Sequence, residues 1–140
     1  GVAAPADWTI AAQLNGDFTQ AKAYEETVAY LQSSPAPDVV YCENDNMCFG
    51  VMQALDELGI AYGDGGVTLI SFDAGRTALS YCKDGKIDLC AECNPLHGPR
   101  VRALIEQLAR GETPEKLSYM PEALFTADTL TAELLESRVY

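Results

Sequence analysis

The sequence is poor in basic residues and contains no long apolar run. Only 9 Lys and Arg stand against 21 Asp and Glu, which gives a formal net charge of −12 at pH 7. Nucleic acids and anionic membrane surfaces need clustered Lys and Arg, so both are disfavoured as partners. No run approaches the roughly 20 apolar residues of a membrane helix, and no basic stretch followed by an apolar one indicates a secretion signal. A neutral ligand or a cation suits this charge better than a phosphorylated molecule.

The sequence also lacks two motifs of α/β enzymes. The nucleophile-elbow pattern G-x-S-x-G and the phosphate-binding loop do not occur, and the single His97 has no evident Ser or Cys partner. An enzyme is therefore disfavoured, and we expect no catalytic residues and no cofactor.

Five cysteines are too few for a disulfide-stapled mini-protein, and their number is odd. Cys42 falls in an apolar run, where a buried thiol behaves as a small hydrophobic side chain. Cys90 and Cys93 form a lone C-x-x-C with only His97 nearby, whereas a structural zinc site needs four ligands. We expect this pair to be structural, with no metal bound.

What the sequence does contain is a strand pattern that occurs three times. The apolar runs Trp8–Gln13, Val39–Cys42 and Val67–Phe72 have centres 30 residues apart, and polar residues follow each run before a helix pattern begins. This spacing is typical of strand–helix–strand units. A chain of 140 residues is the size of one domain, so we predict a single α/β domain with a doubly wound parallel sheet.

Capping residues and glycines indicate where the helices begin and end. Asp17 is a good N-cap for the first helix, and Asp45 or Asn46 caps the second. Gly59 and Gly111 are placed to end the second and fourth helices. Further helices are predicted over 76–83 and 99–110 and after Asp128, with further strands over 87–93 and 117–125. The helix over 99–110 is expected to bury a stripe of four apolar residues, Val101, Leu104, Ile105 and Leu108.

The polar strand ends are candidate ligand contacts, because open α/β sheets bind ligands at the carboxyl ends of their strands. Asp17 and Asp45 serve equally well as helix caps. Asp73 has no obvious helix to cap, and a carboxylate there can accept hydrogen bonds from two hydroxyl groups. Asn44 carries both a donor and an acceptor, which suits an alcohol. Phe18 is either a core residue or an aromatic surface for a sugar ring.

Four segments resemble, in order and spacing, the type I periplasmic sugar-binding proteins of ABC importers. Among these, the galactofuranose-binding branch is the nearest and the ribose-binding proteins are further off. The segments are N-G-D-F-T-Q-A-K (15–22), Y-C-E-N-D-N-M-C-F-G (41–50), L-I-S-F-D-A (69–74) and E-C-N-P-L-H-G-P (92–99). The resemblance runs from about Trp8 to Tyr140.

The resemblance implies two α/β lobes joined by three hinge strands, with a sugar enclosed between the lobes. Residues 8–140 would be the C-terminal part, with hinge strands near 89–94 and 117–125, and residues 1–7 a linker or the edge of the chain. The helix over 99–110 would pack with the other lobe. By resemblance, the sugar contacts are the stacking ring of Phe18 and the polar side chains of Asn44, Asp73, Glu92 and Asn94, with Asp17 beside them.

The implied function is solute binding for an ABC transporter, with a neutral mono- or small oligosaccharide as ligand. The permease is the implied partner, and the location is extracytoplasmic, either periplasmic or as an anchored lipoprotein. The effector-binding domain of a lactose-repressor-type regulator is the nearest alternative, because it shares the fold.

In one respect the chain departs from the family pattern. It lacks the N-terminal lobe and the first strand of the C-terminal lobe, which would lie centrally in the sheet. We expect a swapped partner, a rearranged sheet or a further portion of chain to fill the gap, so this piece is a candidate for a dimer or swapped assembly.

Overall fold

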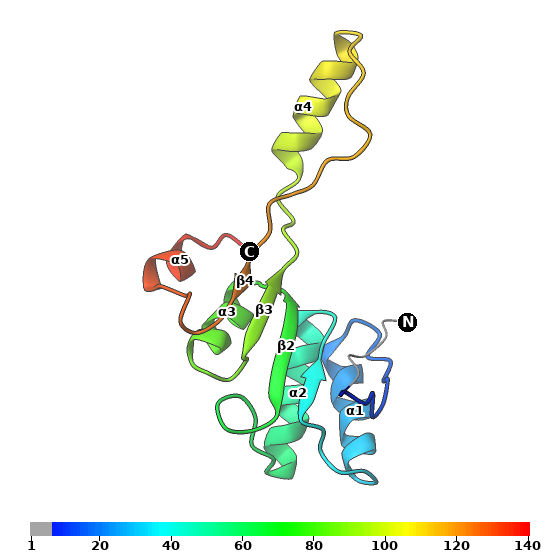
Figure 1. Ribbon diagram of the computed structural model, residues 1–140, viewed down its shortest axis with the longest axis vertical. Helices are drawn as coiled ribbons and strands as arrows, with labels where there is room; N and C mark the ends of the chain where they lie inside the picture. The colour runs from blue at the N-terminus through cyan, green and yellow to red at the C-terminus, as the bar shows by residue number, and fades with distance from the viewer. Residues whose placement is uncertain (1–6) are drawn as a thin grey trace.

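The computed structural model describes residues 7–140, and its elements alternate between helices and strands. None of the helices in this range is both long and apolar enough to cross a membrane. In chain order, the elements are α1 (Gln20–Leu31), β1 (Val39–Tyr41), α2 (Asp45–Leu58), β2 (Thr68–Asp73), α3 (Arg76–Lys83), β3 (Leu89–Glu92), α4 (Gly98–Ala109), β4 (Leu124–Phe125) and α5 (Ala132–Ser137) (Figure 1).

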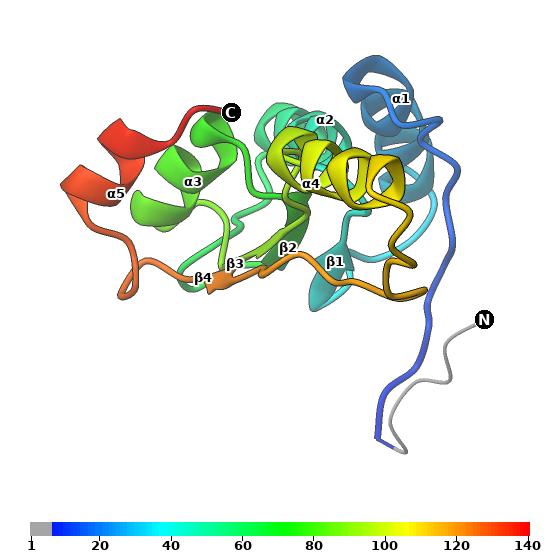
Figure 2. The same cartoon turned by 90° about the horizontal axis from the view of Figure 1, so that it is seen from above.

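The four strands form one sheet in the order β1-β2-β3-β4. The first three strands are parallel, with Val40 opposite Leu69 and Ile70 opposite Leu89, whereas β4 runs antiparallel to β3. The predicted α/β class is thereby confirmed, with a mostly parallel sheet in place of the fully parallel one that the sequence predicts. Helices α1, α2, α3 and α5 lie on one side of this sheet and not on both sides, as a doubly wound arrangement would place them (Figure 2). Parallel strands bring their carboxyl ends to one edge, so Asp73 and Glu92 end up side by side.

The core lies between the sheet and helices α2 and α3. Side chains alternate along β2, where Leu69 and Ser71 are fully buried toward the helices and Ile70 and Phe72 are only half-buried. Figure 2 shows α1, α2, α3 and α5 on the same side of the sheet. The largest apolar side chains that are completely buried are Leu55, Leu69, Leu79, Ile87 and Leu130.

The predicted first strand, Trp8–Gln13, is wrong. These residues belong to no strand, and Trp8 and Ile10 are more than half exposed. A strand needs a neighbour that accepts and donates its backbone hydrogen bonds, and β1 pairs only with β2 among the described residues. An apolar run alone therefore does not make a strand, because it does not supply a pairing partner.

Three helix starts also differ from the prediction. The N-caps are Thr19 for α1, Asn44 for α2 and Thr131 for α5, each accepting a hydrogen bond from the backbone N–H three residues on. Asp17 lies outside α1 in the left-handed region, with φ 48°. The reason is the local backbone conformation. An N-cap residue typically has extended backbone, which lets its side-chain oxygen accept a hydrogen bond from the first turn of the helix, and all three observed caps are extended.

Two predicted helix boundaries are confirmed, whereas two predicted strands are shorter than expected. Helix α3 covers Arg76–Lys83 as expected, and Gly59 ends α2 in the left-handed conformation, with φ 65°. The segment over 62–66 is a turn before β2, closed by a parallel bridge between Tyr62 and Val67. The predicted strands over 87–93 and 117–125 shorten to Leu89–Glu92 and Leu124–Phe125.

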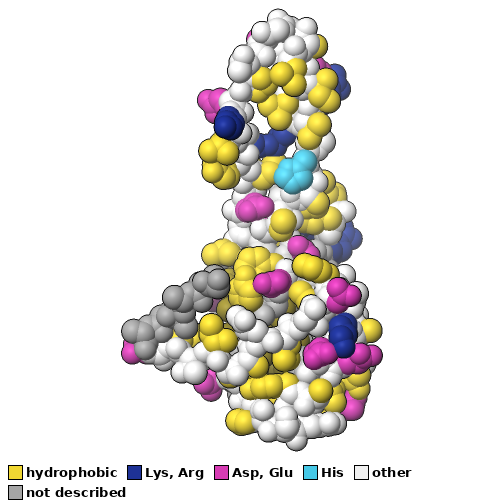
Figure 3. Space-filling view, turned by 90° about the vertical axis from the view of Figure 1, so that its right-hand side faces the viewer, with side chains coloured by type: hydrophobic (Ala, Val, Ile, Leu, Met, Phe, Trp, Pro, Cys, Tyr) yellow, Lys and Arg dark blue, Asp and Glu magenta, His cyan; other side chains and the backbone are white. Residues whose placement is uncertain are grey.

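Helix α4 projects from the body as an arm (Figure 1). The chain leaves the body after β3, forms α4 and returns to β4, so two segments run side by side between the body and the arm. No residue of α4 is buried, and its predicted stripe is wrong as a buried face: Ile105 and Leu108 are each 60% exposed. Hydrophobic side chains gather on the arm in Figure 3. The amphipathic spacing of α4 predicts an apolar face that packs against another element. No other element among residues 7–140 packs against that face.

Candidate ligand-binding site

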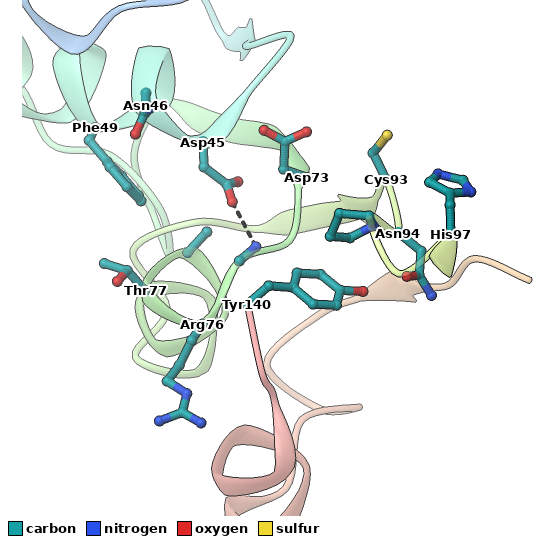
Figure 4. A pocket seen from close by; sticks show the side chains of 13 residues that line it. Asp45, Asn46, Phe49, Asp73, Arg76, Thr77, Cys93, Asn94, His97 and Tyr140 are labelled. Atoms are coloured by element: carbon teal, nitrogen blue, oxygen red, sulfur yellow. Dashed lines mark hydrogen bonds between the residues drawn. The ribbon is translucent and has the colours of Figure 1, made fainter. Parts of the chain in front are cut away.

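A cavity of about 590 Å³ opens at the carboxyl ends of β2 and β3 (Figure 4). This is the edge where the strand-end pattern predicts a ligand site. Four parts of the chain line it: the start of α2, the β2–α3 turn with the start of α3, the segment that leaves β3, and the last described residue. The lining residues include Asp45, Asn46, Phe49, Asp73, Gly75, Arg76, Cys93, Asn94, His97 and Tyr140.

Asp45 is the buried carboxylate at the base of this cavity. It is the first residue of α2 and only 8% exposed. Its two carboxylate oxygens accept hydrogen bonds from the Ser71 hydroxyl (2.5 Å) and the Gly75 backbone N–H (2.7 Å). Burial raises the pKa of Asp45 above its ordinary value, and the nearby charge of Asp73 acts in the same direction. Asp45 therefore holds the β2–α3 turn in place rather than presenting a free carboxylate.

Asp73 is the carboxylate that faces the cavity. It is the last residue of β2, its side chain is exposed, and its φ is 96°. Within residues 7–140 its carboxylate has no side-chain hydrogen-bond partner, although the backbone N–H of Asp45 interacts with it. Figure 4 shows Asp73 beside Asp45 at the cavity. Partial burial raises the pKa of Asp73. A carboxylate in this position can accept hydrogen bonds from hydroxyl groups of a ligand.

Asn94 lies across the cavity, on the segment that leaves β3. Its Oδ1 accepts a hydrogen bond from the Leu96 N–H (2.9 Å), and its backbone N–H donates to Glu122 (3.2 Å). The side-chain amide donors stay available to a ligand. Asp73 and Asn94 are the two sequence-predicted site residues that the structure brings together at the cavity.

Three other predicted residues form a separate group at the edge of α2. The Asn44 side chain caps α2 through the Met47 N–H (2.8 Å) and donates to the Phe18 carbonyl (3.2 Å). Phe18 is 67% exposed, and the exposed Asp17 precedes it in a tight turn. The structure thus places Asn44, Phe18 and Asp17 together but outside the lining of the cavity, with an exposed aromatic ring available for stacking.

Glu92 differs from the other candidates because its carboxylate is engaged by the protein. Its oxygens accept hydrogen bonds from Arg138 (2.7 Å), the Tyr140 hydroxyl and the Ala123 N–H (3.0 Å). Burial favours the neutral form of Glu92, but the bonds from Tyr140 and Arg138 outweigh it, so its pKa lies below the ordinary value. Burial, together with the hydrogen bond to Glu92, raises the pKa of Tyr140 to about 12.

The sequence reasoning missed Tyr140, Arg76 and Phe49 as lining residues. They reach the cavity through contacts between distant parts of the chain. Arg76, for example, donates to carbonyl groups of residues 136 and 138, which lie 60 and 62 positions away. For Asp45 the sequence left a ligand contact and a helix cap equally open, and the structure places it in the lining of the cavity. Cys90 is buried and Cys93 is exposed at the cavity, and no group of three potential metal ligands occurs within residues 7–140.

Residues 2–109 match the profile of a family described as periplasmic binding protein domain. The chain is 31% identical over 124 residues to the galactofuranose-binding protein YtfQ of Escherichia coli K12, covering 86% of this chain and 39% of that protein.

Solved structures show the same likeness. A Mycobacterium smegmatis protein in complex with β-D-fucofuranose superposes with a TM-score of 0.74 at 32% identity, over 81% of this chain and 37% of that one. An arabinose transporter component of Shewanella sp. ANA-3, bound to α- and β-L-arabinofuranose, superposes with a TM-score of 0.76 at 26% identity, over 89% and 45% of the two chains. The chain thus spans about two fifths of the length of the relatives that it matches.

Proposed function

Because the chain belongs to the periplasmic binding protein domain family, we propose that it forms the C-terminal part of the solute-binding subunit of an ABC importer. The proposed ligand is a neutral mono- or small oligosaccharide. One observation carries the proposal: a cavity at the carboxyl edge of the parallel sheet, with the Asp73 carboxylate and the Asn94 amide among the side chains that line it (Figure 4). Acceptors and donors placed across a cavity match the hydroxyl groups of a sugar ring, which both donate and accept.

We also propose that the sugar binds in its furanose form. The support comes from the relatives at 26–32% identity, whose names mention galactofuranose, fucofuranose and arabinofuranose. Phe18, Asn44 and Asp17 are proposed to contact the same ligand from the neighbouring strand end, with the exposed Phe18 ring stacking on it. Glu92 is proposed to act at the hinge strand, where its bonds to Arg138 and Ala123 join β3 to the returning chain.

For the domain organisation, we propose that residues 8–140 form one lobe and that the segments near 89–94 and 117–125 are two of the hinge crossings. Their support is the pair of segments that run between the body and the arm. The exposed apolar face of α4 is proposed to pack on the other lobe. The permease of the importer is the proposed partner, and the proposed location is extracytoplasmic. The sugar-binding relatives favour this reading over a lactose-repressor-type regulator.

The test uses the complete protein and four free sugars: D-galactose, D-fucose, L-arabinose and D-fructose. We expect at least one of them to raise the melting temperature in a thermal-shift assay, because a ligand that binds only the folded state stabilises it. Calorimetry then gives the dissociation constant, and a furanoside locked as its methyl glycoside is compared with the matching pyranoside. No shift with any neutral sugar would contradict the function, and preference for the pyranoside would contradict only the ring form.

A further inference from the structure

The turn that presents Asp73 has an unusual backbone. Asp73 and Ala74 are consecutive non-glycine residues with positive φ, at 96° and 57°. Side chains of L-residues make this region unfavourable, so such a turn persists only where its surroundings hold it. Ala74 is fully buried, and Gly75 follows as the N-cap of α3. The direction of the Asp73 carboxylate therefore depends on what holds this turn.

Two groups hold the turn from opposite sides. On one side Asp45 accepts the Gly75 N–H at 2.7 Å. On the other side, the guanidinium of Arg138 donates twice to the Ala74 carbonyl, through Nε (3.0 Å) and Nη2 (2.7 Å). Arg138 lies 64 positions from Ala74, so the turn between β2 and α3 is fastened to a distant part of the chain.

Arg138 is itself held rigidly. Its third nitrogen, Nη1, donates to Glu92 at 2.7 Å, and the two side chains are only 11% and 8% exposed. The guanidinium carbon lies 4.1 Å from the centre of the Tyr140 ring and 5.3 Å from that of Phe125. The planar guanidinium of Arg138 binds all these partners in one fixed orientation. The ammonium group of a lysine could not make the same set of contacts.

We propose that Arg138 is a positioning residue for sugar binding. By holding the Ala74 carbonyl against the end of β3, it keeps the Asp73 carboxylate directed at the cavity. It does not line the cavity, and it acts through Asp73. This inference rests on the proposed function, and it adds that affinity depends on a side chain outside the ligand site.

The experiment measures sugar affinity by titration calorimetry on the complete protein, with whichever of the four free sugars binds the wild type most tightly. The variants are Arg138→Gln, Arg138→Lys, Asp73→Ala and the double variant Asp73→Ala with Arg138→Gln. Arg102→Gln is the matched control, because Arg102 is an arginine of the arm in an ion pair with Glu106 and its side chain is 82% exposed. Thermal unfolding checks that each variant is folded at the assay temperature.

We expect Arg138→Gln to weaken binding by about tenfold, a typical effect for coupled neighbours. Arg138→Lys should fall between the wild type and this variant, because a lysine keeps the charge opposite Glu92 but not the double donation. In the Asp73→Ala background, Arg138→Gln should change the affinity by less than about twofold, because the carboxylate that it directs is absent. Arg102→Gln should bind as the wild type does.

Two results would overturn the inference. One is wild-type affinity in folded Arg138→Gln or, if that variant does not fold, in Arg138→Lys. The other is an equal loss with and without the Asp73 carboxylate, which would mark Arg138 as a general structural support. Either result leaves the proposed function standing if the wild type binds sugar, whereas a wild type that binds none of the four sugars would overturn both proposals.

Discussion

Asp73 is the residue on which ligand affinity should depend most, because its carboxylate faces the cavity without a side-chain partner. We predict that Asp73→Ala in the complete protein costs about 1.5–3 kcal/mol of binding free energy, or roughly ten- to a hundredfold in affinity. Titration calorimetry measures this loss. Asp64→Ala is the control, because Asp64 is an exposed carboxylate in the turn before β2. An unchanged dissociation constant for Asp73→Ala would remove Asp73 from the site.

Glu92 should make the free energy of unfolding depend on pH under acidic conditions. Its pKa in the folded protein lies below the ordinary value of 4.5, so the folded state favours the charged form. The resulting stabilisation is fully present above pH 4.5 and is lost as the pH falls through the lower, folded-state pKa. We predict that Glu92→Gln is less stable than the wild type at pH 7 and that the difference shrinks as the pH falls below about 4. Melting temperatures of the two proteins between pH 3 and 7 measure it, and a constant difference would contradict it.

At the scale of elements, substitutions on the apolar face of α4 should affect stability differently in the 140-residue chain and in the complete protein. We predict that Ile105→Gln with Leu108→Gln changes the stability of the 140-residue chain by less than about 0.5 kcal/mol, because both side chains are exposed and glutamine is a good helix former. In the complete protein the same pair should be clearly destabilising if, as proposed, the other lobe covers this face. Denaturant unfolding of both chain lengths provides the comparison.

Leu55→Ala is the control for that comparison. Leu55 lies in α2 and is 1% exposed, so its loss should cost about 2–5 kcal/mol in either chain length. If the two α4 substitutions left the complete protein as stable as before, α4 would not pack on a second lobe.

The elements that the sequence predicted well are those with local causes. Helix α3 covers Arg76–Lys83 as predicted, and Gly59 ends α2 at the position that its place after the second helix pattern indicated. The site is different, because its residues depend on contacts between distant positions. Strand-end chemistry indicated Asp73, and the family resemblance indicated Asn94. Arg138 and Tyr140 reach the site through bonds that span 46–64 positions and leave no pattern in the local sequence.

At the scale of the whole molecule, the open cavity limits what this chain can do alone. We predict that the 140-residue chain binds the free sugars at least about a hundredfold more weakly than the complete protein. A sugar in this cavity keeps much of its surface in water, and each hydrogen bond competes with solvent. Calorimetry on both chain lengths tests this prediction. Equal affinity would mean that the described residues already form a complete pocket.

The arm and the cavity share a segment, because Cys93, Asn94 and His97 line the cavity on the stretch of chain that leads from β3 into α4. A rotation of the arm that displaces Asn94 and His97 would therefore change the width of the cavity. Arm orientation and cavity occupancy are then thermodynamically linked, and the linkage is reciprocal. A solute that binds best at one cavity width favours the arm orientation that gives this width. A protein that binds the arm in that orientation then raises the affinity for the solute by the same factor by which the solute raises the affinity for that protein. A receptor that touches only the arm could thus detect whether the cavity is filled.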